Sequence, residues 1–297
     1  MKTLKTLKNY LLLFLLAVTV VACQDQTSEE IAKDQLSEDV SSYQIDNDVA
    51  NGRHKKNVYV LVHGAWHPES SWQDVKWVLE ALGHTVTTVQ LQGLGNDTTP
   101  VETVTFEDHV NAVKNAVLQQ NGKVILVGHS YGGAVISQAA EAVSQKIEKL
   151  VYLSGFMPVD GESVVQLALA NTESLVTQNL IIDGAIAYMT PDNYAKAMYN
   201  QALASRNPFI VFRAKQIIPK LRPQPVLTLV TPLHLTSAYN NLKKVYISCL
   251  KDKAVTPSAQ QSMYSRFAGI TVYKIPESDH CAMITTPVSL IDILRKQ

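Results

Sequence analysis

Residues 124–135 carry the pattern with the clearest chemical meaning in the chain. The apolar run Val124 to Val127 leads into Gly128-His129-Ser130-Tyr131-Gly132, which matches the Gly-x-Ser-x-Gly pattern of a nucleophilic serine on a tight strand-to-helix turn. Glycines are needed two residues before and after the serine, because side chains there would collide with the turn or the neighbouring helix. We therefore predict that Ser130 is a nucleophile. The alternative is a glycine-rich turn in a nucleotide-binding fold.

Two further side chains supply the acid–base chemistry that a serine nucleophile needs. Asp252 and His280 each follow an apolar run that predicts a strand, at the point where catalytic groups gather in open α/β sheets. His280 is expected to take the proton from Ser130 and later give it to the leaving group, while Asp252 fixes the imidazole tautomer. Asp279 is the competing acid, but as the direct neighbour of His280 it is poorly placed to reach that residue's Nδ1.

Attack by serine on a carbonyl creates a negative oxygen that backbone amides must stabilise. The first predicted strand leads into His63-Gly64-Ala65, where Gly64 allows the chain to turn with its amides exposed. We predict that the amides of Ala65 and Tyr131 form this oxyanion hole. A simple strand-to-helix turn is the alternative for the stretch that contains Ala65.

Apolar runs recur along the chain in the rhythm of an α/β protein. Predicted strands cover residues 58–62, 84–91, 124–127, 149–155, 244–249 and 270–275. Helical patterns separate most of them, which predicts a mostly parallel central sheet flanked by helices. One of these helices is predicted to start after Thr105 as N-cap and to run through Val117, with His109 on its solvent side.

Residues 156 to about 232 break this alternation. The segment is mostly helical in pattern, apolar in patches and punctuated by prolines. We predict a helical cap inserted between two strands, which would form an apolar pocket and exclude water from the site.

Composition limits the classes of function. The chain has 297 residues, of which 46% are hydrophobic and 18% charged, enough for one large α/β domain. Lys+Arg and Asp+Glu are equal at 26 each, so the charge balance does not favour nucleic acid as a partner. Neither the Cys/His spacing of a metal site nor a phosphate-binding P-loop is present, so no metal is predicted.

The first 23 residues have the features of a targeting segment. A lysine-containing start precedes the uncharged apolar run Leu11 to Val21, which is short for a membrane span but typical of a signal peptide. Val20-Val21-Ala22-Cys23 resembles the lipobox of bacterial lipoproteins, in which the cysteine is lipidated and becomes the mature N-terminus. An ordinary secretory signal is the alternative.

We therefore predict export, with a lipid anchor at Cys23 that holds the protein to the bacterial outer membrane or cell envelope. Residues 24–56 are polar and poor in aromatic residues, which predicts a flexible tether. The folded domain is then expected to cover residues 57–297.

Several stretches together resemble the plant methylesterase and hydroxynitrile lyase branch of the α/β-hydrolases, and bacterial carboxylesterases of that branch. They are residues 62–67, 94–95, 127–133, 156–163, 245–253 and 278–283. The resemblance covers about residue 57 to the C-terminus. It implies the α/β-hydrolase fold and a cofactor-free serine esterase with an apolar pocket under a helical cap.

Two positions separate the chemistries within that branch. Hydroxynitrile lyases there typically carry Thr where this chain has Gly64, and Lys where it has Cys281. We therefore predict a carboxylesterase that cleaves small, largely apolar esters through an acyl-enzyme. A lyase that cleaves a carbon–carbon bond and a non-catalytic surface protein that binds a small molecule are the alternatives. Cys249 and Cys281 are predicted to be free, semi-buried thiols, with a disulfide as the alternative.

Overall fold

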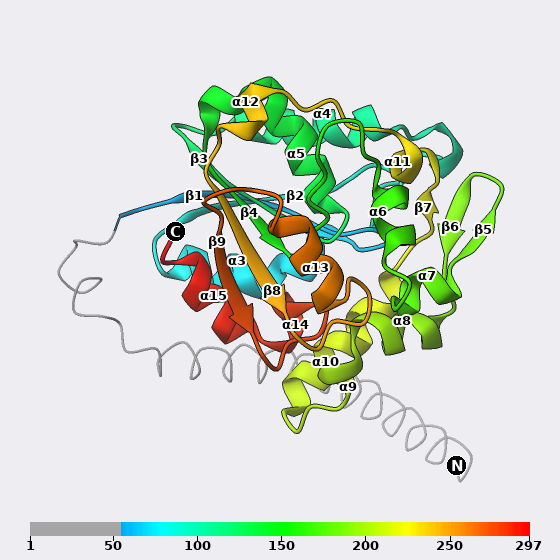
Figure 1. The fold of residues 1–297 in the computed structure, drawn as a ribbon. Helices are drawn as coiled ribbons and strands as arrows, with labels where there is room; N and C mark the ends of the chain where they lie inside the picture. Colours follow the sequence, from blue (N-terminus) through cyan, green and yellow to red (C-terminus); the bar gives the residue numbers. More distant parts are fainter. Residues whose placement is uncertain (1–54) are drawn as a thin grey trace, which may run out of the picture. The chain divides into compact units, whose positions relative to one another are not determined.

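A six-stranded parallel sheet forms the centre of the computed structural model, which describes residues 55–297 (Figure 1). The strand order is β2-β1-β3-β4-β8-β9, and every neighbouring pair is parallel. The strands are Val58–Val62 (β1), Thr85–Val89 (β2), Val124–His129 (β3), Ile147–Leu153 (β4), Lys244–Cys249 (β8) and Thr271–Ile275 (β9). The predicted parallel sheet is confirmed.

Helices cover both faces of the sheet because the chain first adds a strand on one side of β1 and then adds the remaining strands on the other side. α3 (Gln73–Ala81) leads from β1 to β2, whereas α4 (Phe106–Leu118) leads back across β1 to β3. Since such crossovers are right-handed, opposite directions put these helices on opposite faces. α5 (Gly132–Val143) and α13 (Pro257–Tyr264) continue in the direction of α4, and α15 (Pro287–Leu294) packs beside α3 (Figure 1).

Two of the inner strands, β3 and β8, are buried along their whole length. All six residues of β3 and all six of β8 are buried, whereas most residues of the edge strands β2 and β9 are exposed or half-buried. Continuous burial is expected of parallel strands that are covered by helices on both faces. It also explains the unbroken apolar run Val124 to Val127 in β3 and the mostly apolar sequence of β8.

Helix α4 begins where the sequence predicts. The Thr105 hydroxyl accepts the Asp108 amide at 3.2 Å, and the Asp108 carboxylate accepts the Thr105 amide at 2.8 Å, which makes a capping box. The predicted solvent position of His109 is wrong, because its side chain is fully buried. Its ring nitrogens lie 2.8 Å from the Tyr131 hydroxyl and 2.9 Å from the Gln92 carbonyl oxygen, and these partners make burial of a polar ring tolerable.

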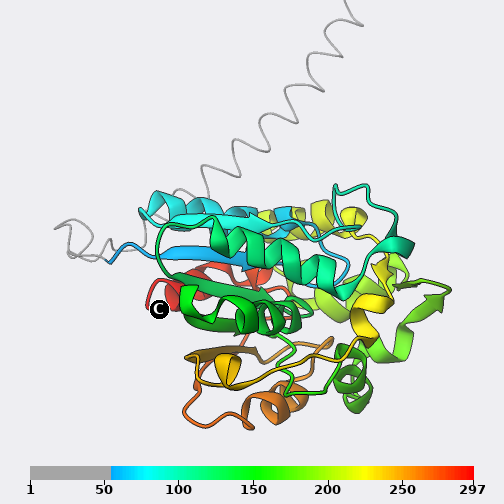
Figure 2. The same cartoon turned by 90° about the horizontal axis from the view of Figure 1, so that it is seen from above.

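Most of the segment between β4 and β8 forms a cap at one end of the strands (Figure 2). Its helices are α6 (Val164–Ala170), α7 (Leu175–Asn179), α8 (Pro191–Met198), α9 (Asn200–Leu203), α10 (Pro208–Ile217) and α11 (Leu227–Val230). Three short strands, β5 (Ile181–Asp183), β6 (Ile186–Tyr188) and β7 (Gln224–Pro225), form a separate antiparallel sheet. The prediction of a helical cap did not include this small sheet.

Short elements complete the fold. They are helices α12 (Ser237–Asn240) and α14 (Ala282–Thr285), and the 3₁₀ turns η1 (Glu69–Trp72), η2 (Val101–Thr103), η3 (Ser144–Lys146) and η4 (Ile218–Lys220). The predicted signal segment and Cys23 lie outside the described residues. Within residues 55–297, no helix is long and apolar enough to cross a bilayer.

Candidate active site

Ser130 stands at the sharp turn between β3 and α5, in a strained backbone conformation. Its φ is +53°, in the left-handed region that residues other than glycine rarely adopt. Three backbone hydrogen bonds hold it there: the Ser130 amide donates to the Leu153 carbonyl at 3.1 Å, and the Ser130 carbonyl accepts the Gly133 and Phe156 amides at 2.9 Å each. The side chain therefore projects from a rigid position at the end of the sheet.

The glycines around Ser130 are required by close backbone approaches. A Cβ on Gly128 would lie 2.5 Å from the Gly132 carbonyl oxygen, and a Cβ on Gly132 would lie 2.6 Å from the His63 carbonyl oxygen. Since these neighbours are backbone atoms, they cannot rotate away. The two glycines thus let β1, β3 and α5 meet beside the serine, as the sequence pattern predicts.

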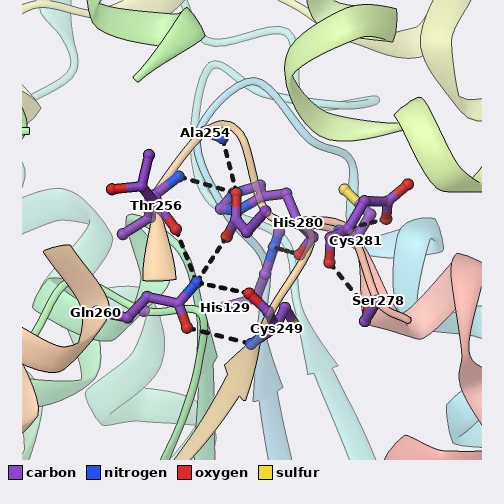
Figure 3. Close-up of polar contacts among 12 residues, drawn as sticks. His129, Cys249, Ala254, Thr256, Gln260, Ser278, His280 and Cys281 are labelled. Atoms are coloured by element: carbon purple, nitrogen blue, oxygen red, sulfur yellow. Dashed lines mark hydrogen bonds and ion pairs between the residues drawn. The ribbon is translucent and has the colours of Figure 1, made fainter. Parts of the chain in front are cut away.

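The structure brings His280 and Asp252 together in the interior. His280 Nδ1 lies 2.8 Å from Asp252 Oδ2, and both side chains are almost completely buried. The Asp252 carboxylate also accepts the Ala254 amide at 2.7 Å, the Val255 amide at 2.9 Å and the Gln260 amide group at 3.1 Å (Figure 3). Because the carboxylate can only accept, Nδ1 carries the imidazole proton, which leaves Nε2 as an acceptor.

Asp279, the competing acid, is engaged elsewhere. Its carboxylate accepts the Gln201 and Ala202 amides at 2.9 Å each, the Cys281 amide at 3.2 Å and the Thr285 hydroxyl. Burial raises the pKa of Asp279, and these donors oppose the rise. Asp279 therefore ties the loop that carries the histidine to cap helix α9, and Asp252 is the partner of the imidazole, as predicted.

Ala65 and Tyr131 line the same cavity as Ser130 and His280. Among the residues that the structure describes, neither backbone amide donates to another protein group. The Tyr131 amide precedes α5, where the positive end of the helix dipole favours an anion. The two amides predicted for the oxyanion hole are thus available beside the serine.

Neutral histidines pack around this centre. The His129 ring centroid lies 4.6 Å from that of His280, and His129 Nε2 lies 3.0 Å from the His280 carbonyl oxygen. Burial lowers the pKa of His67 to about 4 and that of His129 well below its usual value. These residues, which sequence reasoning did not assign to the site, therefore add no charge beside the Asp252–His280 pair.

The cavity over Ser130 is apolar. It has an empty volume of about 540 Å³, part of which is open to solvent. Its lining contains no acidic, lysine or arginine side chain. The hydroxyls of Ser174 and Thr177, which also line it, donate to the carbonyls of Ala254 (2.6 Å) and Ala168 (3.0 Å). A bound molecule therefore meets mainly hydrocarbon surface outside the serine–histidine corner.

Both cysteines of the described region are free, as predicted, but they are fully buried and not semi-buried. Cys249 ends the central strand β8, and Cys281 Sγ lies 3.5 Å from His67 Nε2 in the interior. Burial raises the pKa of Cys249 to about 12, so this thiol stays protonated and unreactive.

Comparison with known proteins identifies the relatives of this chain. The sequence model of the alpha/beta hydrolase family matches residues 59–293. Methylesterase 1 of Arabidopsis thaliana is 30% identical over 258 residues, which cover 82% of this chain and 96% of that protein. Salicylic acid-binding protein 2 of Nicotiana tabacum is 28% identical over 80% of this chain and 97% of its own length.

Solved structures agree on the fold. The crystal structure of polyneuridine aldehyde esterase superimposes with a TM-score of 0.70 at 24% identity, covering 82% of this chain and 99% of that one. A crystal structure of the pyrethroid hydrolase PytH superimposes with a TM-score of 0.70 at 21% identity, over 82% of this chain and 97% of the other. The α/β-hydrolase fold that the sequence predicts is thereby confirmed.

Proposed function

The chain belongs to the alpha/beta hydrolase family, in its methylesterase-like branch, and on that basis we propose that it is a serine carboxylesterase for small, uncharged, largely apolar esters. The observation that carries the proposal is the position of Ser130 and His280 in one apolar cavity, with the imidazole fixed by a buried carboxylate. Relatives with esterase names support the reaction class.

The proposed mechanism assigns one step to each group. Ser130 Oγ attacks the ester carbonyl while His280 Nε2 takes its proton, and the resulting imidazolium is stabilised by Asp252. The Ala65 and Tyr131 amides stabilise the negative oxygen of the tetrahedral intermediate. Its collapse breaks the bond to the alcohol, which leaves with the proton from His280. Water then attacks the acyl-enzyme with the same residue as base, releasing the acid.

The lining of the cavity supports an uncharged substrate. An ester with a free carboxylate or ammonium group would lose its hydration there without gaining a partner of opposite charge. Apolar acyl and alcohol groups gain about 25 cal/mol for each Å² of surface that they bury. The acid product carries a charge that the pocket does not compensate, which favours its release.

The crowding at Gly64 argues against the lyase alternative. A Cβ at this position would lie 2.8 Å from Ser130 Cβ and 2.9 Å from His129 Nδ1, so the threonine found in hydroxynitrile lyases would displace the serine or the neighbouring ring. Cys281 is a buried thiol and not an ammonium group. Both groups that would assist a cyanide leaving group are therefore replaced in this chain.

Removal of the nucleophile tests the proposal. We expect Ser130→Ala to lower kcat for p-nitrophenyl acetate and butyrate by at least about 10⁴-fold, because the acyl-enzyme cannot form. Steady-state kinetics measures the loss, with circular dichroism as the check on folding. Ser265→Ala, at an exposed position, is the matched control and should keep wild-type rates.

Two outcomes would contradict the assignment. Ester turnover retained by Ser130→Ala would place the nucleophile elsewhere. Absence of both ester hydrolysis and fluorophosphonate labelling of Ser130 in the wild-type protein would instead favour the non-catalytic binding protein, and cyanide release from mandelonitrile would favour the lyase.

A further inference from the structure

Every polar group of Trp66, the residue after Ala65, forms a hydrogen bond with the cap. Its backbone amide donates to Gln224 Oε1 at 3.1 Å, and its carbonyl accepts the Arg222 amide at 2.9 Å. Its indole Nε1 donates to the Ala187 carbonyl at 2.8 Å. Gln224 and Ala187 belong to the small antiparallel sheet of the cap, so that sheet grips the loop from β1 directly.

This grip holds a conformation that the loop would not keep on its own. Trp66 has a φ of +66°, which is strained for a bulky side chain and persists only where the surroundings impose it. The peptide group between Ala65 and Trp66 is fixed at both ends. His67 Nδ1 lies 2.7 Å from the Ala65 carbonyl oxygen, and the Trp66 amide of the same peptide group donates to Gln224 Oε1. This peptide group and the Ala65 amide are both attached to the Ala65 Cα. The direction in which the Ala65 amide points therefore depends on the orientation of the peptide group.

The neighbours of the Gln224 side chain allow its amide group only one orientation, in which the oxygen accepts the hydrogen bond from the Trp66 amide. Its Nε2 donates to Thr228 Oγ1 at 2.6 Å, and the Thr228 hydroxyl donates to the Pro225 carbonyl at 2.6 Å. With the donor side of the amide occupied, the oxygen must face Trp66. Gln224 is fully buried, and it is not among the residues that line the substrate cavity. Its polar groups therefore serve the loop and not a ligand.

The same cap segment reaches the other proposed oxyanion donor. Burial raises the pKa of Tyr131, and an interaction with the Thr228 side chain opposes the rise. Tyr131 is also held by His109, whose Nδ1 lies 2.8 Å from the phenol oxygen. Gln224 thus holds Trp66, the neighbour of Ala65, and Thr228 interacts with Tyr131.

We propose that Gln224 is a positioning residue for ester hydrolysis: from the cap, it holds the Trp66 amide and thereby aims the Ala65 amide at the oxyanion. The inference rests on the proposed function, in which the Ala65 amide stabilises the tetrahedral intermediate. It assigns the cap a part in arranging the transition-state site, besides forming the walls of the pocket.

Substitution of Gln224 tests this role with p-nitrophenyl acetate as substrate. Gln224→Met keeps the length of the side chain and removes the acceptor. We expect its kcat to fall about 10- to 100-fold with KM changed less than about 2-fold, because an oxyanion donor acts in the transition state and not in substrate binding. Gln224→Glu, which keeps an oxygen toward Trp66, should retain more of the wild-type kcat than Gln224→Met.

The matched control is Thr190→Ala, which removes the N-cap hydrogen bond of cap helix α8 without touching the loop. It weakens the start of that helix and should leave kcat at the wild-type value. Wild-type kcat in Gln224→Met would overturn the proposal. So would equal losses in Gln224→Met and Thr190→Ala, since these would report general loosening of the cap.

Hydrogen–deuterium exchange separates this inference from the proposed function. The peptide that contains residues 64–67 should exchange faster in Gln224→Met than in the wild type or in Thr190→Ala, whatever substrate the enzyme takes. Unchanged exchange would overturn the role of Gln224. A wild-type protein without esterase activity would overturn the proposed function, while faster exchange in the variant would still support the hold of Gln224 on the loop.

Discussion

The buried histidine side chains around the active site are held in their neutral form. Burial lowers the pKa of His63 to about 3 and that of His67 and His109 to about 4. Each ring also has a partner suited to the uncharged tautomer. His67, for example, lies 2.7 Å from the Ala65 carbonyl oxygen through Nδ1 and 2.7 Å from the Tyr199 hydroxyl through Nε2. Protonation would remove the acceptor nitrogen.

These histidines should make the protein sensitive to mild acid. Below a pH of about 6.5, the unfolded chain binds protons that the folded chain cannot, so stability is full above this pH and is lost as the pH falls toward the folded pKa values. Between about pH 7 and about pH 5, His67 and His109 should each remove about 2 kcal/mol from the free energy of unfolding, measured by urea titration. The raised pKa of Asp279 acts in the opposite direction.

A variant pair checks the assignment to buried rings. His109→Gln should flatten the dependence of unfolding free energy on pH, whereas His234→Gln, at an exposed position, should not change it. An unfolding free energy that is equal at the two pH values would contradict the prediction.

Among the elements, the long buried strands were predictable and the short cap strands were not. β3 and β8 could be recognised because burial on both faces makes their sequences mostly apolar. β5, β6 and β7 have three, three and two residues, too few for any periodicity to show. The one-turn helix α14, directly after the loop that carries His280, was missed for the same reason.

The site divides in a similar way. Ser130, Asp252 and His280 could be found because each follows a strand, and strand ends of a parallel sheet meet at one edge. The hold of Gln224 on Trp66 could not, because the two lie 158 positions apart and no sequence pattern pairs them. His109 was misplaced because polarity alone assigned it to the surface, while its partners lie in other elements.

The loop after β4 lies between two cavities and should limit the length of the acyl group that the enzyme accepts. Phe156 and Val255 line both the main cavity and a smaller one of about 320 Å³ beside α6 and α13. Phe156→Ala should connect them, because it removes a ring that lines both. The turn at Ser130 should be kept, because the Phe156 contact with Ser130 is made by the backbone. We expect the ratio of kcat/KM for p-nitrophenyl octanoate to that for acetate to rise at least about 5-fold.

A matched substitution isolates the effect of the connection. Leu167→Ala enlarges the smaller hollow alone, since Leu167 lines it without reaching the main cavity, and should leave the octanoate-to-acetate ratio unchanged. Equal ratios in Phe156→Ala and the wild type would show that the two hollows do not communicate.

At the scale of the whole molecule, we propose that the hydrolase works while attached to a membrane through Cys23. Cys23→Ser should move the protein from the membrane fraction to the soluble exported fraction, because two or more acyl chains are needed for stable anchoring and none can then be attached. Immunoblots of fractionated cells measure the distribution. Cys249→Ala is the control and should stay with the membranes. A wild-type protein found only in the soluble fraction would favour an ordinary secretory signal.

The contact between His67 and Cys281, 214 positions apart, also has a meaning for the order of synthesis. Of the strands in the central sheet, the one that leads to Ala65 is made first and lies inside the sheet, while the one that leads to His280 is made last and forms an edge. A chain that is cut short, or still emerging from the ribosome, holds the nucleophile without its base. Such long-range pairing forms late in folding. Hydrolytic activity in this architecture is therefore a signal that the whole polypeptide has been completed.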